Sequence, residues 1–557
     1  MMEGTVSKYA IGIDYGTLSV RALLIDIHTG DKIAQRVYEY PHAVMTGCLP
    51  TGEQLQPDWA LQHPQDYLDG LVETVSGIMK DSGVAPQNVV GLAIDVTAST
   101  ILPVYRNKQP LCMTRQFERE PHAYIKMWKH HGGEAEAVRM TAVALERQEP
   151  WLKRYGGKIS SEWMFPKLLE TLHCAPDVAK SADYFLEVMD WLTWILTDQL
   201  SVSACGTGYK ALCAEGSFPG QEYFEALDPE LAWLVQSKMT LPASKIGECA
   251  GCLCPEMAGK LHLLPGIPIG VPIIDAHSSV LGGGISRPGE MMIIMGTSSC
   301  HLMLSARDAA IPGIQGNVRD GILPGFYGIE AGQSCVGDHF DWVIRNMFPE
   351  TYAVEARKMG ISPHALMADK LKGYRAGSNG LLALDWFNGV RSPLMDFDLN
   401  GLIIGFNLST KPEDVYLALI EATAFGTRAI CDSFEQAGVP VDSIILGGGI
   451  PSKNPFIVQV YADVLDRNIR ICASDQACAL GAAMLGIQAA SPSVTGYGSL
   501  SEIVATLGRA QGQIFVPDPA QAARYHELYK DYLLLQDCFG RKDKALMYRL
   551  TGRRKDT

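Results

Sequence analysis

The sequence lacks the features that would place the chain in a membrane or on a nucleic acid. No apolar stretch approaches the ~18 uninterrupted residues that a membrane span needs. The first residues, Met1 to Thr5, lack the basic and apolar regions of a signal peptide. Runs of Lys or Arg are absent before Arg553-Arg554-Lys555, and the formal net charge is −14. We therefore expect a cytoplasmic protein with neither a nucleic acid nor a membrane among its partners.

The spacing of a zinc site is also missing, although the chain contains 14 Cys. Cys249 and Cys252 form a Cys-x-x-Cys pair, but Cys254 is followed by Pro255, and no second pair lies at zinc-finger distance. We expect free thiols, as is usual in a reducing compartment, and no zinc at this cluster.

The length and composition are those of a globular protein with more than one core. The chain has 557 residues, of which 47% are hydrophobic and 19% charged. This is too long for a single core and too apolar for disorder. Low-complexity linkers are absent, so we expect about two to four domains, with a short structured connection near Ser286 to Gly289.

The segment from Ala10 to Asp26 predicts two strands joined by a tight turn. An apolar run leads into Asp14, turns at Gly16-Thr17 and continues with further apolar residues. Gly16 lets a ligand approach the backbone, Thr17 and Ser19 can bind phosphate oxygens, and Asp14 can hold Mg²⁺ through water. An ordinary hairpin whose Asp caps the turn is the alternative.

A second copy of this pattern lies half a chain away. Residues 291–304 repeat the apolar run and the turn, with Gly296-Thr297 matching the first Gly-Thr pair. Two such hairpins predict a duplicated α/β architecture whose halves face each other across a nucleotide. In the second half, the strand 443–446 and its Gly-Gly-Gly turn take the place of the strand that ends at Asp95.

Asp14 and the two Gly-Thr turns resemble the phosphate loops of the actin-like ATPase superfamily and, within it, the FGGY carbohydrate kinases. The resemblance extends from about residue 9 to 535. It implies two duplicated actin-like (ribonuclease H-like) α/β domains that face a central cleft, with a Trp-rich helical insertion at 120–235 in the first. We expect a sugar-binding domain with the catalytic base at 1–286 and a nucleotide-binding domain at 287–557.

Asp275 is the candidate general base. It follows an apolar strand in the segment 270–284, and small residues after it let a helix begin close to a bound phosphate. A helix N-cap is the alternative reading of this Asp. The resemblance to FGGY kinases implies that Asp275 is the catalytic base, and that Asp14 and Asp275 hold Mg²⁺ through water.

The nucleotide site is predicted around the segment 446–459, whose glycines let a flat base lie on bare backbone. The segment 473–483 resembles the same family, and the G-x-x-x-x-G-K-[ST] motif of a P-loop kinase is absent. The implied residues for ATP are Asp14, Gly16, Thr17, Ser19, Arg21, Gly296, Thr297, Ser298, Gly337, Gly448, Gly449 and Asn454.

The sugar site is implied by four segments that resemble the ribulokinase branch of the family, at 128–130, 206–212, 329–334 and 384–393. Lys210 could instead be a surface lysine and Glu330 an acid at the edge of the core. The implied residues for an open-chain ketopentose are Thr97, Ala98, Trp128, Lys210, Asp275 and Glu330.

The resemblance therefore implies ATP-dependent phosphorylation of L-ribulose to L-ribulose 5-phosphate, a step of L-arabinose catabolism. The alternatives are another FGGY kinase, acting on D-ribulose, xylulose or glycerol, and an actin-like ATPase. A homodimer is one option for the assembly. ADP release that depends on added sugar distinguishes a kinase from an ATPase.

Overall fold

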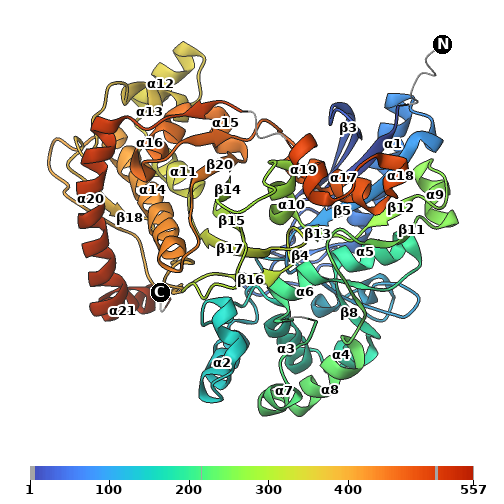
Figure 1. Cartoon of the computed structure of the whole chain (residues 1–557). Coiled ribbons are helices and arrows are strands. Elements are labelled where there is room, and N and C mark those ends of the chain that lie inside the picture. The colour runs from blue at the N-terminus through green and yellow to red at the C-terminus, as the bar shows by residue number, and fades with distance from the viewer. Residues whose placement is uncertain (1–6, 215, 509–511, 556–557) are drawn as a thin grey trace, which may run out of the picture.

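The computed structural model describes residues 7–214, 216–508 and 512–555. Figure 1 shows two lobes side by side, the blue start of the chain lying in one and most of the last half in the other, with a mostly helical region below the first lobe. Each lobe contains one of the two seven-stranded sheets found in this part of the chain. The predicted two-domain α/β architecture is therefore confirmed.

The first sheet is built on the hairpin that the sequence predicted. β1 and β2 are antiparallel, whereas β5 runs parallel to β1 and pairs Asp95 with Asp14. β13 continues beside β5 and ends immediately before Asp275. The carboxylates of Asp14, Asp95 and Asp275 therefore lie at the same edge of the first sheet. The strand order is β11 (Cys249–Cys252), β12 (Pro268–Gly270), β5 (Val89–Val96), β1 (Tyr9–Tyr15), β2 (Ser19–Asp26) and β3 (Lys32–Glu39), with β13 (Ile273–Ile274) paired to β5.

Helices cover both faces of this sheet. Tyr15 stacks on Tyr67 of α1 (Pro64–Ser82), with ring centroids 5.4 Å apart. Gly12 is three residues earlier in β1 and therefore faces the other side, where α17 (Ala477–Ala489) crosses it. A Cβ at Gly12 would lie 1.8 Å from the carbonyl oxygen of Ala479. Only glycine allows this helix to approach the strand so closely.

The second sheet repeats the first, as the duplicated motif predicts. β14 pairs antiparallel with β15 and parallel with β20, in the way that β1 pairs with β2 and β5. Strand 443–446 therefore takes the place of the strand that ends at Asp95, as predicted. The order is β16 (Gly316–Arg319), β17 (Tyr327–Gln333), β15 (Ser299–Ser305), β14 (Glu290–Met295), β20 (Ser443–Gly447), β21 (Ile469–Ile471) and β22 (Ile514–Phe515).

The chain returns to the first lobe between β21 and β22, the last two strands of the second sheet. In Figure 1 the orange and red helices α17, α18 (Pro492–Thr495) and α19 (Leu500–Leu507) lie on the first lobe. Leu480 and Ile503 belong to the same buried core as the strands of the first sheet. The domain boundary at 286/287 remains a prediction. Residues 477–507 follow this boundary in the sequence but pack with the first domain. The helices of the second lobe are α11 (Gly337–Met347), α12 (Glu350–Met359), α13 (Pro363–Lys370), α14 (Pro412–Gln436), α15 (Gly449–Lys453), α16 (Pro455–Leu465), α20 (Pro519–Asp537) and α21 (Lys544–Lys555).

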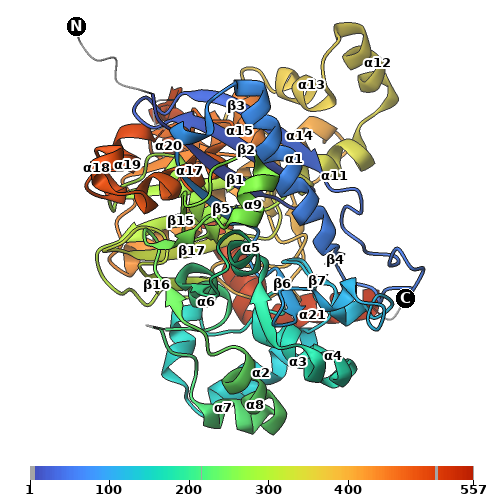
Figure 2. The ribbon, with the colours of Figure 1, turned by 90° about the vertical axis from the view of Figure 1, so that its right-hand side faces the viewer.

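The region below the first lobe has a core of its own, in which Trp163, Phe165 and Tyr223 are buried. Figure 2 shows its helices clustered on the side away from β1 and β2. A four-stranded sheet connects it to the first lobe, in the order β4 (Leu61–Gln62), β7 (Ile125–Lys126), β6 (Ile101–Val104) and β8 (Tyr184–Glu187). Its helices are α2 (Glu134–Glu146), α3 (Met164–Cys174), α4 (Pro176–Ser181), α7 (Gln221–Leu227) and α8 (Pro229–Lys238). By contrast, α5 (Val188–Thr197) and α6 (Ala204–Lys210) bury residues such as Trp191 and Tyr209 in the core of the first sheet.

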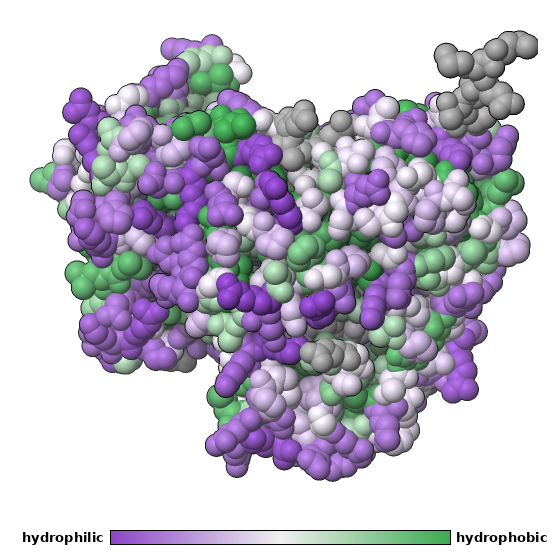
Figure 3. All heavy atoms as spheres, viewed as in Figure 1, coloured by the Kyte–Doolittle hydropathy of each residue, from purple (hydrophilic) through white to green (hydrophobic). Residues whose placement is uncertain are grey.

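The face drawn in Figure 3 is mainly hydrophilic, with apolar residues in small separate groups and a notch between the lobes. No single helix in the described ranges is long and apolar enough to cross a membrane. The helices at 477–489 and 492–507 pass that test only as a pair, with a bend of 114° between them.

Candidate functional site

Three aspartates meet where β1, β5 and β13 end. Asp14 and Asp95 are register partners on adjacent parallel strands, and Asp275 is the first residue of α10 (Asp275–Gly282). Oδ1 of Asp275 accepts the backbone N–H of Ala276 at 2.7 Å. Neither oxygen of Asp95 has a hydrogen-bond partner of good geometry in the described part of the chain. This edge therefore brings together three carboxyl groups whose oxygens a cation can bind.

The surroundings change the acidity of these carboxyls. Burial and the neighbouring Asp14 charge raise the pKa of Asp275 from 3.8 to about 7, with Lys210 opposing the rise. Burial, Asp14 and Asp275 raise the pKa of Asp95 well above its ordinary value. A carboxylate whose pKa lies near neutrality is suited to accept a proton from a hydroxyl group.

The first Gly-Thr turn contacts both Asp14 and the insertion. Nη1 of Arg21 lies 2.9 Å from Oδ2 of Asp14. The backbone N–H of Gly16 donates to the carbonyl of Ser19 at 3.0 Å, which closes the turn. Thr17 accepts the indole N–H of Trp128 at 3.1 Å. The structure thus brings Trp128 to the predicted phosphate loop as well as to the predicted sugar side.

Lys210 and Glu330 form an ion pair across the two lobes. Lys210 ends α6 in the first domain, and Glu330 lies on β17 of the second; Nζ is 2.8 and 2.9 Å from the two carboxylate oxygens. Nε2 of His277 lies 3.3 Å from the same carboxylate. Burial raises the pKa of Glu330, but the Lys210 ammonium and the His277 ring outweigh it and hold the pKa well below its ordinary value. Glu330 raises and Lys210 lowers the pKa of Asp275, so this ion pair belongs to the same site.

The predicted residues Thr97 and Ala98 lie in a tight turn after β5. The hydroxyl groups of Thr97 and Thr100 are 2.9 Å apart, and the N–H of Thr97 donates to the carbonyl of Tyr15 at 3.1 Å. Ser99 has a positive φ of 53°. The turn therefore begins beside β1, close to where the first phosphate loop starts.

The second lobe contains a cavity of about 920 Å³. Phe340, Tyr416 and Phe456 supply apolar wall. The second Gly-Thr turn is held against α11, since the N–H of Gly337 donates to the carbonyl of Gly296 at 3.0 Å. Of the predicted nucleotide residues, Gly296, Thr297, Gly337, Gly449 and Asn454 line this cavity, whereas Ser298, Gly448 and the first loop do not.

Sequence reasoning missed two residues of this site. Asp95 was noted only as the end of a strand, although its position beside Asp14 follows from a parallel pairing that one sequence does not reveal. His277 stacks on Tyr209, with ring centroids 4.2 Å apart. Its spacing of two residues from Asp275 was the available signal.

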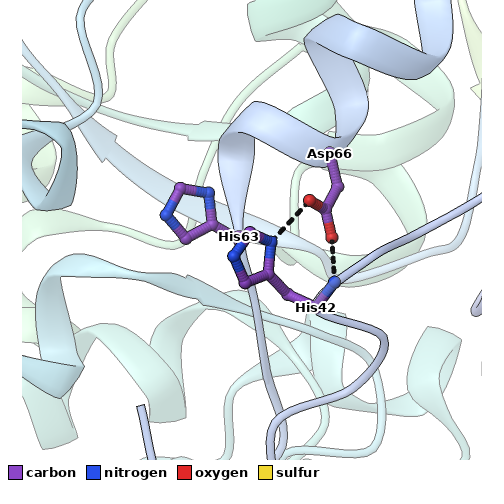
Figure 4. A group of neighbouring side chains, drawn as sticks. All are labelled: His42, His63 and Asp66. Atoms are coloured by element: carbon purple, nitrogen blue, oxygen red, sulfur yellow. Dashed lines mark hydrogen bonds and ion pairs between the residues drawn. The ribbon is translucent and has the colours of Figure 1, made fainter. Parts of the chain in front are cut away.

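A separate group of side chains lies at the start of α1. Figure 4 shows His42 bonded to Asp66, whose oxygens accept His42 Nδ1 at 2.7 Å and the His42 backbone N–H at 3.1 Å. His63 stacks on His42, and its Nδ1 accepts the N–H of Gln65 at 3.2 Å. Both Nδ1 atoms are thus engaged in holding the helix start, although the three residues lie close enough together to share a metal ion.

Two sequence profiles match the chain. The N-terminal domain of the FGGY family of carbohydrate kinases matches residues 9–282, and the C-terminal domain of that family matches residues 291–490. Among curated proteins, the ribulokinase of Geobacillus thermodenitrificans is 46% identical over 98% of this chain and 96% of its own length. The ribulokinase of Staphylococcus aureus is 39% identical over 97% of this chain and 98% of its own.

Solved structures show the same fold at low identity. The xylulose kinase of Rhodospirillum rubrum has a TM-score of 0.74 at 20% identity, covering 96% of this chain and 99% of that protein. The gluconate kinase of Lactobacillus acidophilus has a TM-score of 0.79 at 17% identity, covering 97% and 100%. The chain therefore belongs to the FGGY family of carbohydrate kinases and is an ATP-dependent sugar kinase.

Proposed function

We propose that this kinase phosphorylates L-ribulose on its terminal hydroxyl to give L-ribulose 5-phosphate. The observation that carries the proposal is the buried Lys210–Glu330 ion pair beside Asp275, which joins the two lobes. An open-chain ketopentose has several hydroxyls and a carbonyl that can bond to these charged groups, whereas glycerol has too few atoms to reach all of them. Full-length relatives named ribulokinase, 39% to 46% identical, favour the same substrate.

Asp275 is the proposed general base. Its carboxylate takes the proton of the terminal hydroxyl as the oxygen attacks the γ-phosphorus, and ADP leaves from the opposite side. Thr97, Ala98 and Trp128 are proposed to form the wall that holds the sugar, and Lys210 and Glu330 to bind its oxygens. Closing the lobes over the sugar keeps water away from the γ-phosphate.

The edge where β1 and β5 end suits Mg²⁺, because that ion prefers hard oxygen ligands. Asp14 and Asp275 supply such oxygens, and beside them lie the oxygens of Asp95, for which the described residues provide no hydrogen-bond partner. When bound with the nucleotide, Mg²⁺ would neutralise the phosphate charge. The two Gly-Thr turns would bind phosphates, and the cavity at Gly449 and Asn454 would take the adenosine.

The test is a coupled assay for ADP with the purified chain, ATP and one acceptor at a time. L-ribulose, D-ribulose, L- and D-xylulose and glycerol are compared by kcat/KM. We expect L-ribulose to give the highest value and ADP release to require sugar. A higher value for xylulose or glycerol would refute the substrate assignment and leave the family unaffected.

A further inference from the structure

Lys167 is a buried lysine without a part in the proposed chemistry. It lies on α3 and is 1% exposed. Its Nζ donates to the backbone carbonyls of Ser99 and Met127, each at 2.7 Å. Ser99 belongs to the turn that contains Thr97 and Ala98, and Met127 directly precedes Trp128. One side chain therefore bonds to both proposed walls of the sugar pocket.

The backbone of the turn at 97–100 is strained, so interactions with other parts of the chain must keep it in place. Ser99 has a φ of 53°, in the left-handed region that non-glycine residues rarely adopt. Lys167 bonds the carbonyl of Ser99 from one side. From another element, Oε2 of Glu187 accepts the N–H of Thr100 at 2.9 Å. Two side chains thus fix the carbonyl and the N–H of one peptide group, the one that joins Ser99 to Thr100, and this group cannot rotate without losing one of these bonds.

We propose that Lys167 is a positioning residue, which holds the turn at 97–100 and the segment 127–128 at the separation that sugar binding requires. This inference rests on the proposed sugar site. Without the Nζ donor, the carbonyls of Ser99 and Met127 lose the charged donor that links them, the Met127 carbonyl keeps only the N–H of His130 at 3.0 Å, and each segment is free to shift away from the other. Sugar affinity then falls because part of the binding energy must restore the separation.

The insertion offers a matched control for the loss of a buried lysine. Lys238 on α8 is 7% exposed and also donates only to backbone carbonyls, those of Ala179, Lys180 and Ala182. None of these residues belongs to the proposed sugar pocket. Lys238→Met therefore removes the same kind of interaction without touching either wall.

The experiment compares Lys167→Met with Lys238→Met in the full chain. Both variants should lower the Tm. We expect Lys167→Met to raise the KM for L-ribulose by about tenfold or more, the loss expected for charged hydrogen bonds to buried partners. Its KM for ATP should change far less, because the residues that line the nucleotide cavity all lie between Met295 and Ile457 and Lys167 bonds to none of them. Lys238→Met should change neither KM.

A folded Lys167→Met with the wild-type KM for L-ribulose overturns the proposal. If that variant does not fold, Lys167→Leu, which also lacks the Nζ donor, is measured under the same criterion. Hydrogen exchange on the unaltered chain gives a further test: L-ribulose should slow exchange at 97–100 and 126–128 together, and protection of only one segment contradicts the inference. A wild-type chain that phosphorylates no ketopentose would instead refute the proposed function.

Discussion

Replacing Asp275 with Asn removes the proposed base while changing the shape of the site very little. The amide oxygen can still accept the N–H of Ala276, which now bonds Oδ1 at 2.7 Å. An amide cannot accept the proton of the attacking hydroxyl. We expect kcat to fall by about 10²–10⁴-fold, the usual contribution of a general base. Sugar binding should persist, because Lys210 and Glu330 remain.

The same substitution should leave the folded protein at least as stable, and the structure indicates by how much. Without metal, the pKa of Asp275 rises from 3.8 to about 7 on folding, so the charged form is disfavoured in the folded state. Stability is lost as the pH rises from the unfolded pKa to the folded one, and the loss is complete above about pH 7. The change in the pKa of Asp275 from 3.8 to about 7, at about 1.36 kcal/mol for each pH unit, sets an upper bound of about 4 kcal/mol on the stability that Asp275→Asn can add.

Two measurements test this reasoning together. Thermal melts are recorded in chelator-containing buffer at about pH 5.5 and about pH 8. The Tm of Asp275→Asn should exceed that of the wild-type chain by a larger margin at the higher pH. Steady-state assays with Mg²⁺-ATP and L-ribulose give kcat, and equilibrium binding gives the sugar affinity. Near-wild-type kcat would remove Asp275 from the mechanism. A lower Tm with a proportional loss of sugar binding would show that its role is structural.

Three other outcomes are expected. Glu330→Gln and Lys210→Met should each lower kcat/KM for L-ribulose, because each leaves a buried partner unpaired. Isothermal titration should show unchanged ATP binding, and a loss of ATP affinity would contradict the assignment of both residues to the sugar site. Asp14→Ala should weaken the use of Mg²⁺-ATP, measured as the Mg²⁺ dependence of the rate, but should not change sugar binding measured in the absence of nucleotide. An unchanged metal dependence would mean that the role of Asp14 is structural. Burial lowers the pKa of His301 to about 3, so the unfolded chain alone gains its proton below about pH 6.5 and stability should fall on acidification. His301→Asn should flatten the slope of Tm against pH, and an unchanged slope would assign the acid sensitivity to other groups.

Local patterns in the sequence were sufficient for the elements that position the site. The apolar run, the Gly-Thr turn and their repetition predicted both hairpins, because a strand's periodicity and a turn's need for glycine are properties of neighbouring residues. The strand before Asp275 and the helix after it follow from the same kind of signal. The FGGY resemblance extended these local predictions to two facing α/β domains, which the sheets and the family profiles confirm.

Contacts between distant parts of the chain were decided by tertiary structure alone. The position of Asp95 beside Asp14 depends on which strand becomes the parallel neighbour of β1. Lys167 reaches Ser99 and Met127 only because the insertion folds α3 against the end of β5. Residues 477–507 return to the first sheet because α17 packs against β1. Gly12 leaves room for this contact but does not determine which helix makes it. In each case the partner is many residues away, so its identity is a property of the packed fold and no local pattern encodes it.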